Sequence, residues 1–114
     1  MSFNKIIIIG HVGQGPRINT ANGKTVANYS VATTHKVGNT EETTWFSCVS
    51  WEKQAEFIQK WVSKGSLLYV EGRMRISKYT DAQGVEKCFP EVMVSNVQKL
   101  DKGNADSYND DLPE

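Results

Sequence analysis

The stretch T-T-W-F-S-C-V-S-W, which runs from Thr43 to Trp51, decides the fold of this chain. Side chains of a strand alternate between two faces, so Trp45 and Trp51 would share one face of a strand here. Phe46 and Cys48 would lie on the other face. A strand in a small antiparallel sheet normally has one apolar face in the core and one polar face in water. Because both faces carry aromatic rings, this segment is either buried on both sides or exposes tryptophan for a purpose.

The residues that precede this stretch have the pattern of a hairpin, a strand and a loop. The pair Asn22-Gly23 is typical of a two-residue hairpin turn. Residues 25–34 then alternate in polarity, which predicts a strand with its larger side chains inward. The polar residues 35–43, broken at Gly38-Asn39, are predicted to be a loop that leads into the central strand.

Three other segments are predicted to be strands. Residues 5–10, K-I-I-I-I-G, are mostly β-branched, so this strand is either buried on both faces or has one face in a subunit contact. A domain this small favours the contact. In residues 67–76, apolar and polar side chains alternate more clearly than anywhere else in the chain. Residues 87–97 return after a turn at Gly84, and Pro90 predicts an edge or a bulge in this last strand.

Helical periodicity occurs in residues 52–64, where apolar side chains, among them Ile58 and Val62, recur at three- and four-residue spacing. Gly65 is predicted to end this helix. Trp61 is predicted to be a core or capping ring rather than a binding ring, because it lies beside the apolar stripe.

These elements predict an all-β fold with one helix. Five main strands with a helix between the third and the fourth are the layout of the OB-fold, a five-stranded Greek-key barrel with protruding hairpins. The outer face and loops of this fold bind oligonucleotides or oligosaccharides. The length of 114 residues predicts a single domain, which we place at residues 1–100. No periodic pattern of apolar residues continues beyond residue 100, so residues 101–114 are predicted to be a short flexible acidic tail.

The charge distribution separates a basic body from this acidic tail. The net charge is zero, but residues 1–100 contain 12 Lys and Arg against 8 Asp and Glu, whereas residues 101–114 contain one Lys against five acidic residues. This asymmetry points weakly to a polyanionic partner. No apolar run reaches the ~18 residues of a membrane span. Without a secretory signal pattern the expected location is the cytoplasm, where Cys48 and Cys88 would stay reduced.

A nucleotide-binding or catalytic function has little support in the sequence. Gly10, Gly13 and Gly15 form a G-x-x-G-x-G pattern, but an extended segment rather than a helix follows it. A turn or bulge is therefore favoured over a phosphate-binding loop. His11 and His35 have no carboxylate or cysteine at ligand spacing. The sequence thus predicts no catalytic residue, no metal site and no cofactor.

The residues do fit the binding of a single-stranded nucleic acid, which requires rings that stack on bases and cations that contact phosphates. The candidate rings are Trp45, Trp51 and Tyr79. The candidate cations are Arg73, Arg75, Lys78, Lys87, Lys5, Lys36 and Lys53. The alternative is that each ring lies in the core and that the arginines form an ordinary solvated face. Two tryptophans on one strand face, with other apolar residues opposite, favour exposure.

The chain resembles bacterial single-stranded-DNA-binding proteins of the homotetrameric OB-fold type over about residues 3–100. The resemblance is carried by an ordered set of motifs: N-K-I-I-I-I-G-H-V-G-Q-G-P, V-A-N-Y-S-V-A-T, T-T-W-F-S-C-V-S-W, K-G-S-L-L-Y-V-E-G-R-M-R and S-K-Y-T-D-A-Q-G. It implies that bases stack on Trp45, Trp51 and Tyr79. It also implies basic contact positions at Lys5, Lys53, Lys64 and Lys78.

The resemblance implies a non-enzymatic function, the sequence-nonspecific binding and protection of single-stranded DNA in replication, recombination and repair. It implies a homotetramer, with the Ile6–Ile9 run in a subunit contact, located in the cytoplasm at the nucleoid. The alternative, from another class, is an OB-fold module of the primosome type, whose aromatic face docks protein and whose nucleic-acid binding is weak.

The chain departs from the family pattern at three places. Val37 stands where a fourth stacking Trp often occurs, so that subsite is expected to be weaker or absent. Phe46 stands where a subunit-contact His can occur. Family members end in a Phe that enters pockets on replication and repair proteins, but the acidic tip here is Asp110, Asp111, Leu112, Pro113 and Glu114. Either this terminus is truncated or altered, or the chain recruits such partners poorly.

Overall fold

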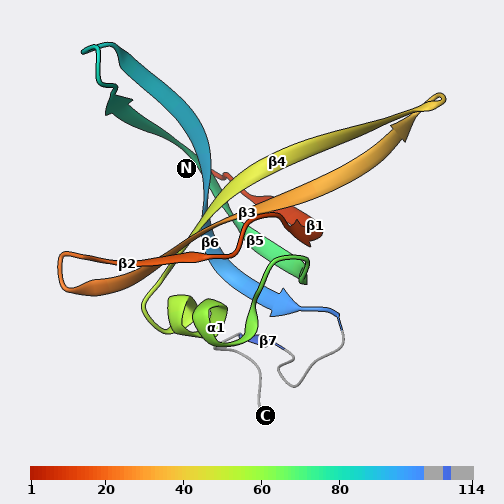
Figure 1. The fold of residues 1–114 in the computed structure, drawn as a ribbon, viewed down its shortest axis with the longest axis horizontal. Helices are drawn as coiled ribbons and strands as arrows, with labels where there is room; N and C mark the ends of the chain where they lie inside the picture. Colours follow the sequence, from red (N-terminus) through yellow and green to blue (C-terminus); the bar gives the residue numbers. More distant parts are fainter. Residues whose placement is uncertain (102–106, 109–114) are drawn as a thin grey trace.

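The computed structural model describes residues 1–101 and 107–108 of the chain (Figure 1). Its elements are β1 (Ile6–Val12), β2 (Arg17–Ala21), β3 (Lys24–Val37), β4 (Thr40–Trp51), α1 (Lys53–Trp61), β5 (Leu67–Thr80), β6 (Glu86–Lys99) and β7 (Ser107–Tyr108). The all-β class with a helix is therefore confirmed. In the described part of the chain no helix is long and apolar enough to cross a membrane.

Five of the strands close into a barrel. Hydrogen-bonded neighbours follow the order β1-β5-β6-β4-β3, and β1 also pairs with β3, which completes the ring. β4 and β6 run parallel, whereas the other pairs in the ring are antiparallel. β2 lies outside the ring and pairs with β3. This is the predicted OB-fold barrel, and α1 lies between its third and fourth strands in chain order.

Two junctions in this ring are short. β1 meets β3 over two residue pairs, and β4 meets β6 over two, Cys48 with Val92 and Val49 with Met93. The β1–β5, β5–β6 and β3–β4 junctions are much longer. The barrel thus consists of two well-paired sheets, β1–β5–β6 and β2–β3–β4, that are joined at two short seams.

The core fills the inside of this barrel. Val31 and Cys48 are fully buried there, and Ile58 of α1 packs into the same cluster. Burial raises the pKa of the Cys48 thiol to about 12, so this thiol stays protonated at neutral pH. The hydroxyl of Tyr29 forms a buried hydrogen bond of 2.8 Å with Oγ of Ser50. The inward face predicted for Phe46 and Cys48 of the central strand is therefore correct, with Phe46 only partly buried against the cluster.

Three hairpins project from the barrel (Figure 1). The β2–β3 hairpin turns at Asn22-Gly23 as predicted, with both residues at positive φ. The β5–β6 hairpin turns near Gly84, again as predicted. The third hairpin contradicts the predicted loop over residues 35–43. β3 continues to Val37, β4 begins at Thr40, and the two strands pair along this whole segment.

The loop prediction was wrong because these residues are polar on both faces, so the hydrophobic alternation of a strand is missing. The strand register nevertheless continues along this segment and places Lys36 directly opposite Glu41, although the two side chains form no ion pair within the described residues. Gly38 adopts the positive φ, 64°, that the tight turn requires. The β3–β4 hairpin is therefore an extended arm with both faces in water.

The helix ends earlier than predicted. α1 stops at Trp61, and Val62 is already extended. Gly65 lies in the next turn, where its amide donates a hydrogen bond of 2.8 Å to the carbonyl of Val12. This contact with β1 turns the chain away from the helix axis, while Val62 remains buried. Trp61 packs partly buried against the core, as predicted.

The acidic tail is described only in part. Ser107 and Tyr108 form β7, which pairs antiparallel with β6 at Val97 and Gln98. Asp101 is also described and lies 2.9 Å from Nζ of Lys99, whereas residues 102–106 and 109–114, which include the acidic tip, lie outside the described residues.

Candidate nucleic-acid interface

The strand register places one continuous row of side chains on the outer face of the barrel, the face opposite the core. The row crosses five strands in the order β2, β3, β4, β6 and β5. Its members are Arg17, Asn28, Val49, Met93 and Arg73. This face carries the candidate rings of β4 and of the β5–β6 arm.

On this outer face, the indole of Trp45 packs against the backbone of a glycine. The indole is 58% exposed and lies opposite Ala32 of β3. A Cβ atom placed on Gly13 would come within 2.6 Å of Cη2 of the indole, and it would also crowd Oγ of Ser30. The ring therefore rests on the backbone of Gly13 and leaves much of its surface to solvent.

Trp51 is less available than Trp45. It lies on the same face of β4, opposite Val26, and is only partly exposed. Six residues separate the two indoles along the strand, which corresponds to about 20 Å at ~3.3 Å per residue. The two tryptophans therefore cannot share a single base and belong to separate positions on the face.

A second group of rings lies on the β5–β6 arm. Tyr79 is 48% exposed and meets Phe89 edge to face, with ring centroids 5.7 Å apart. Phe89 is itself 36% exposed. Sequence reasoning missed this ring, although the turn at Gly84 fixes the pairing of Ser77 with Phe89 and so puts Phe89 on the face of Tyr79. Alternation counted back from that turn would have found it.

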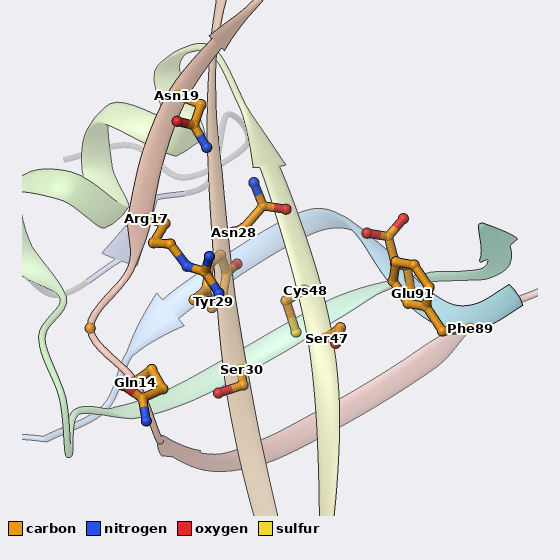
Figure 2. A pocket seen from close by; sticks show the side chains of 11 residues that line it. Gln14, Arg17, Asn19, Asn28, Tyr29, Ser30, Ser47, Cys48, Phe89 and Glu91 are labelled. Atoms are coloured by element: carbon orange, nitrogen blue, oxygen red, sulfur yellow. The ribbon is translucent and has the colours of Figure 1, made fainter. Parts of the chain in front are cut away.

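A hollow lies on the outer face of the barrel between the arm and β2. Its volume is about 340 Å³, and Figure 2 shows the side chains that line it. Phe89 and Glu91 of β6 stand on one side of β4, and Arg17 and Asn28 stand on the other. Its remaining lining residues are Gln14, Gly15, Asn19, Tyr29, Ser30, Ser47 and Cys48. None of the polar residues that line this hollow was predicted from the sequence to contact a ligand.

The predicted cations fall into two groups. Three of them have acidic partners: Lys5 is 3.0 Å from Glu71, Arg75 is 3.4 Å from Glu91, and Lys87 is 3.4 Å from Asp81. The others are exposed and form no ion pair within the described residues; they are Arg73, Lys78, Lys36, Lys53 and Lys64. The structure thus leaves the second group available to an added polyanion.

The predicted cations also do not all lie together. Lys87 stands opposite Tyr79 on the arm, whereas Lys78 pairs with Cys88 and so points to the other face. Lys36 is near the tip of the β3–β4 arm, and Lys53 opens α1. The cations therefore surround the outer face rather than form one track along it.

Hydrogen bonds keep Glu71 and Asp81 ionised by lowering the pKa of each carboxyl group. The pKa of Glu71 lies below its ordinary value because the Tyr69 hydroxyl donates to it, with Lys5 as a further partner. The pKa of Asp81 is also lowered, first by the backbone amide of Val85. Neither carboxylate stands in the hollow.

The glycine-rich segment, residues 10–15, begins within β1 and leads into β2. Gly10 packs against the carbonyl of Ala32, Gly13 lies under Trp45, and Pro16 precedes β2. A phosphate-binding loop of the nucleotide type would instead open a helix. Within the described residues no cluster of His, Cys, Asp or Glu side chains is placed to hold a metal ion.

Comparison with known proteins agrees with this architecture. The model of the single-strand binding protein family matches residues 3–100. The chain belongs to this family. A single-stranded DNA-binding protein of Bacteroides thetaiotaomicron is 37% identical over 116 residues, which cover 94% of this chain and 71% of the relative. A single-stranded DNA-binding protein of Rickettsia conorii is 35% identical over 122 residues, which cover 96% of this chain and 80% of the relative.

Other members of the single-strand binding protein family extend the comparison. The chain is 33% identical to a Neisseria meningitidis serogroup B single-stranded DNA-binding protein, of which it spans 65%. Among solved structures, the Plasmodium falciparum SSB complex with ssDNA matches with a TM-score of 0.80 and 30% identity, over 89% of this chain and 97% of that one. The resemblance seen in the sequence is thereby confirmed.

Proposed function

We propose that this chain binds single-stranded DNA with little regard to sequence and protects it during replication, recombination and repair. The observation that carries the proposal is the outer face of the barrel, on which two separate groups of exposed rings, Trp45 and the Tyr79–Phe89 pair, are surrounded by unpaired cations. Family membership and the likeness to a structure solved with ssDNA support the same ligand.

The rings and the cations would do different work in the complex. Bases stack on Trp45, Trp51 and Tyr79, each stacked base contributing roughly 1–3 kcal/mol. Phosphates contact the cations that surround the face. The cations without an ion pair contact phosphate more readily than Arg75, Lys87 and Lys5, because these three must first break ion pairs with acidic side chains. Stacking uses a feature that every base has, so the resulting affinity tolerates changes of sequence. Neither role requires a cofactor or a catalytic group.

We also propose that the protein assembles as a homotetramer. Ile7 and Ile9, on the outward face of β1, are 54% and 55% exposed in the single chain. Such β-branched residues on a strand surface are costly to leave in water. Recruitment of replication and repair proteins would use the tail residues Asp110, Asp111, Leu112 and Pro113, and a cytoplasmic location at the nucleoid follows from the ligand.

A fluorescence titration with oligo-dT tests the DNA-binding proposal. Quenching of the indoles on addition of DNA, with an affinity that falls as salt rises, is the expected result. Trp45→Ala should weaken binding and leave the unfolding midpoint close to that of the parent, because this ring is mostly in solvent. Absence of quenching, or an affinity insensitive to salt, would exclude the proposal; capture of a replication protein without DNA affinity would favour the protein-docking alternative.

A further inference from the structure

We propose that the hollow between β2 and the β5–β6 arm is a nucleobase pocket, in which Phe89 supplies the stacking surface and Asn28 and Arg17 contact the polar edge of the base. The proposal rests on the proposed DNA-binding function and adds to it a binding position that the predicted rings do not provide. It assigns a ligand-contacting role to three residues outside the set of predicted contacts.

The size and position of the hollow suit a base. A volume of about 340 Å³ is far more than a single water requires, since water occupies ~30 Å³ in the liquid. The hollow lies between the position of Trp45 and the Tyr79–Phe89 pair on the arm, since Ser30, whose Oγ lies near Gly13 beside the indole, lines it at one end and Phe89 lines it at the other. A strand that stacks on both groups of rings would cross it.

Phe89 provides the apolar wall. Its contact with Tyr79 is edge to face, at an interplanar angle of 66°, so the two rings do not cover one another by stacking. Phe89 is partly exposed and lines the hollow. Tyr79 therefore fixes the position of a ring that still has surface available to a base.

The opposite wall offers unused hydrogen-bonding groups. Arg17 and Asn28 are directly opposite in the β2–β3 pairing and both line the hollow. Neither side chain makes a hydrogen bond or an ion pair with another residue in the described part of the chain. An asparagine amide both donates and accepts, and a guanidinium donates, so together they can pair with the edge of any base.

On the wall formed by Phe89 and Glu91, opposite Arg17, the carboxylate of Glu91 favours a base over a phosphate. This carboxylate lines the same hollow and accepts hydrogen bonds from Ser77 and Arg75. The pairing with Arg75 leaves no net positive charge on that wall, so a phosphate there would approach a carboxylate at close range. A neutral base carries no such penalty, and its amino groups can donate to carboxylate oxygen.

The test compares Phe89→Leu and Asn28→Ala with the parent chain, with Ile76→Ala as the matched control. Ile76 is an exposed apolar residue of the same arm that points to the other face. We expect Phe89→Leu to raise the Kd for oligo-dT about ten-fold, the loss of one stacked base, and Ile76→Ala to leave it unchanged. Unfolding midpoints report whether each variant is folded.

A double variant separates a shared base from two independent effects. Phe89 and Asn28 lie on different strands. If they nevertheless hold the same base, the affinity lost in the double variant should be little more than the affinity lost in the weaker-binding single variant. Fully additive losses, or a Phe89→Leu variant that binds like the parent, would overturn the pocket. If Phe89→Leu does not fold, the affinity of Asn28→Ala for oligo-dT alone tests the pocket. Failure of the parent chain to bind DNA would refute the proposed function instead.

Discussion

At the scale of single residues, the contact between Gly13 and Trp45 gives the glycine-rich segment a role in positioning a ring. We expect Gly13→Ala to displace the indole and to weaken oligo-dT binding about three- to ten-fold, part of the energy of one stacked base. The variant is compared with the parent chain by fluorescence titration and by thermal unfolding.

A second-site change distinguishes this steric effect from a general loss of stability. Trp45→Phe removes the outer indole atoms that a methyl group on Gly13 would strike. Adding Gly13→Ala to the Trp45→Phe chain should therefore cost less affinity than adding it to the parent chain. An equal cost in both backgrounds would show that Gly13 does not act through the indole.

Burial of Cys48 predicts how stability changes at alkaline pH. The thiol has an ordinary pKa of 9.0 and a folded pKa of about 12, so between these values the unfolded chain releases a proton that the folded chain keeps. The contribution of Cys48 to the free energy of unfolding should then be constant below about pH 9 and fall as the pH rises toward 12. Denaturant titrations at several pH values measure the slope, which Cys48→Ala should reduce. Tyr29, whose pKa is raised first by burial, adds to the same trend.

At the scale of elements, the β3–β4 arm does not pack on the core, and its register places Lys36 opposite Glu41. Lys36→Glu would place like charges opposite one another at Lys36 and Glu41. We expect faster amide hydrogen exchange in residues 34–43 and unchanged exchange in the barrel strands. Lys36→Gln is the control that removes the attraction without adding repulsion. Equal exchange in all three chains would show that the pair does not hold the arm.

The same elements show where sequence was sufficient and where it was not. Alternation of apolar residues predicts β5, and Asn22-Gly23 predicts the turn between β2 and β3, because each is a local property. The β3–β4 arm escapes prediction since neither of its faces meets the core. The placing of Asn28 beside Phe89 escapes it for another reason: it depends on the β4–β6 pairing, which joins distant segments of the chain.

At the scale of the whole molecule, the exposed isoleucines of β1 predict assembly. We expect the parent chain to scatter light as a tetramer at micromolar concentration and Ile9→Lys to form smaller species, because a charge on this face would be costly to bury. Val37→Asp is a control, since Val37 is equally exposed but lies at the tip of an arm. A parent chain that is monomeric, or an Ile9→Lys chain that is still tetrameric, would contradict this interface.

The two short seams of the barrel have a consequence for how it moves. The proposed pocket takes Asn28 from the β2–β3–β4 sheet and Phe89 from the β1–β5–β6 sheet, so its walls belong to opposite sides of the β4–β6 seam. A base held between them would oppose any separation of the two sheets. Occupancy of the pocket and opening of the barrel are then competing events, and the amides of Cys48 and Val92 should exchange more slowly once DNA is bound.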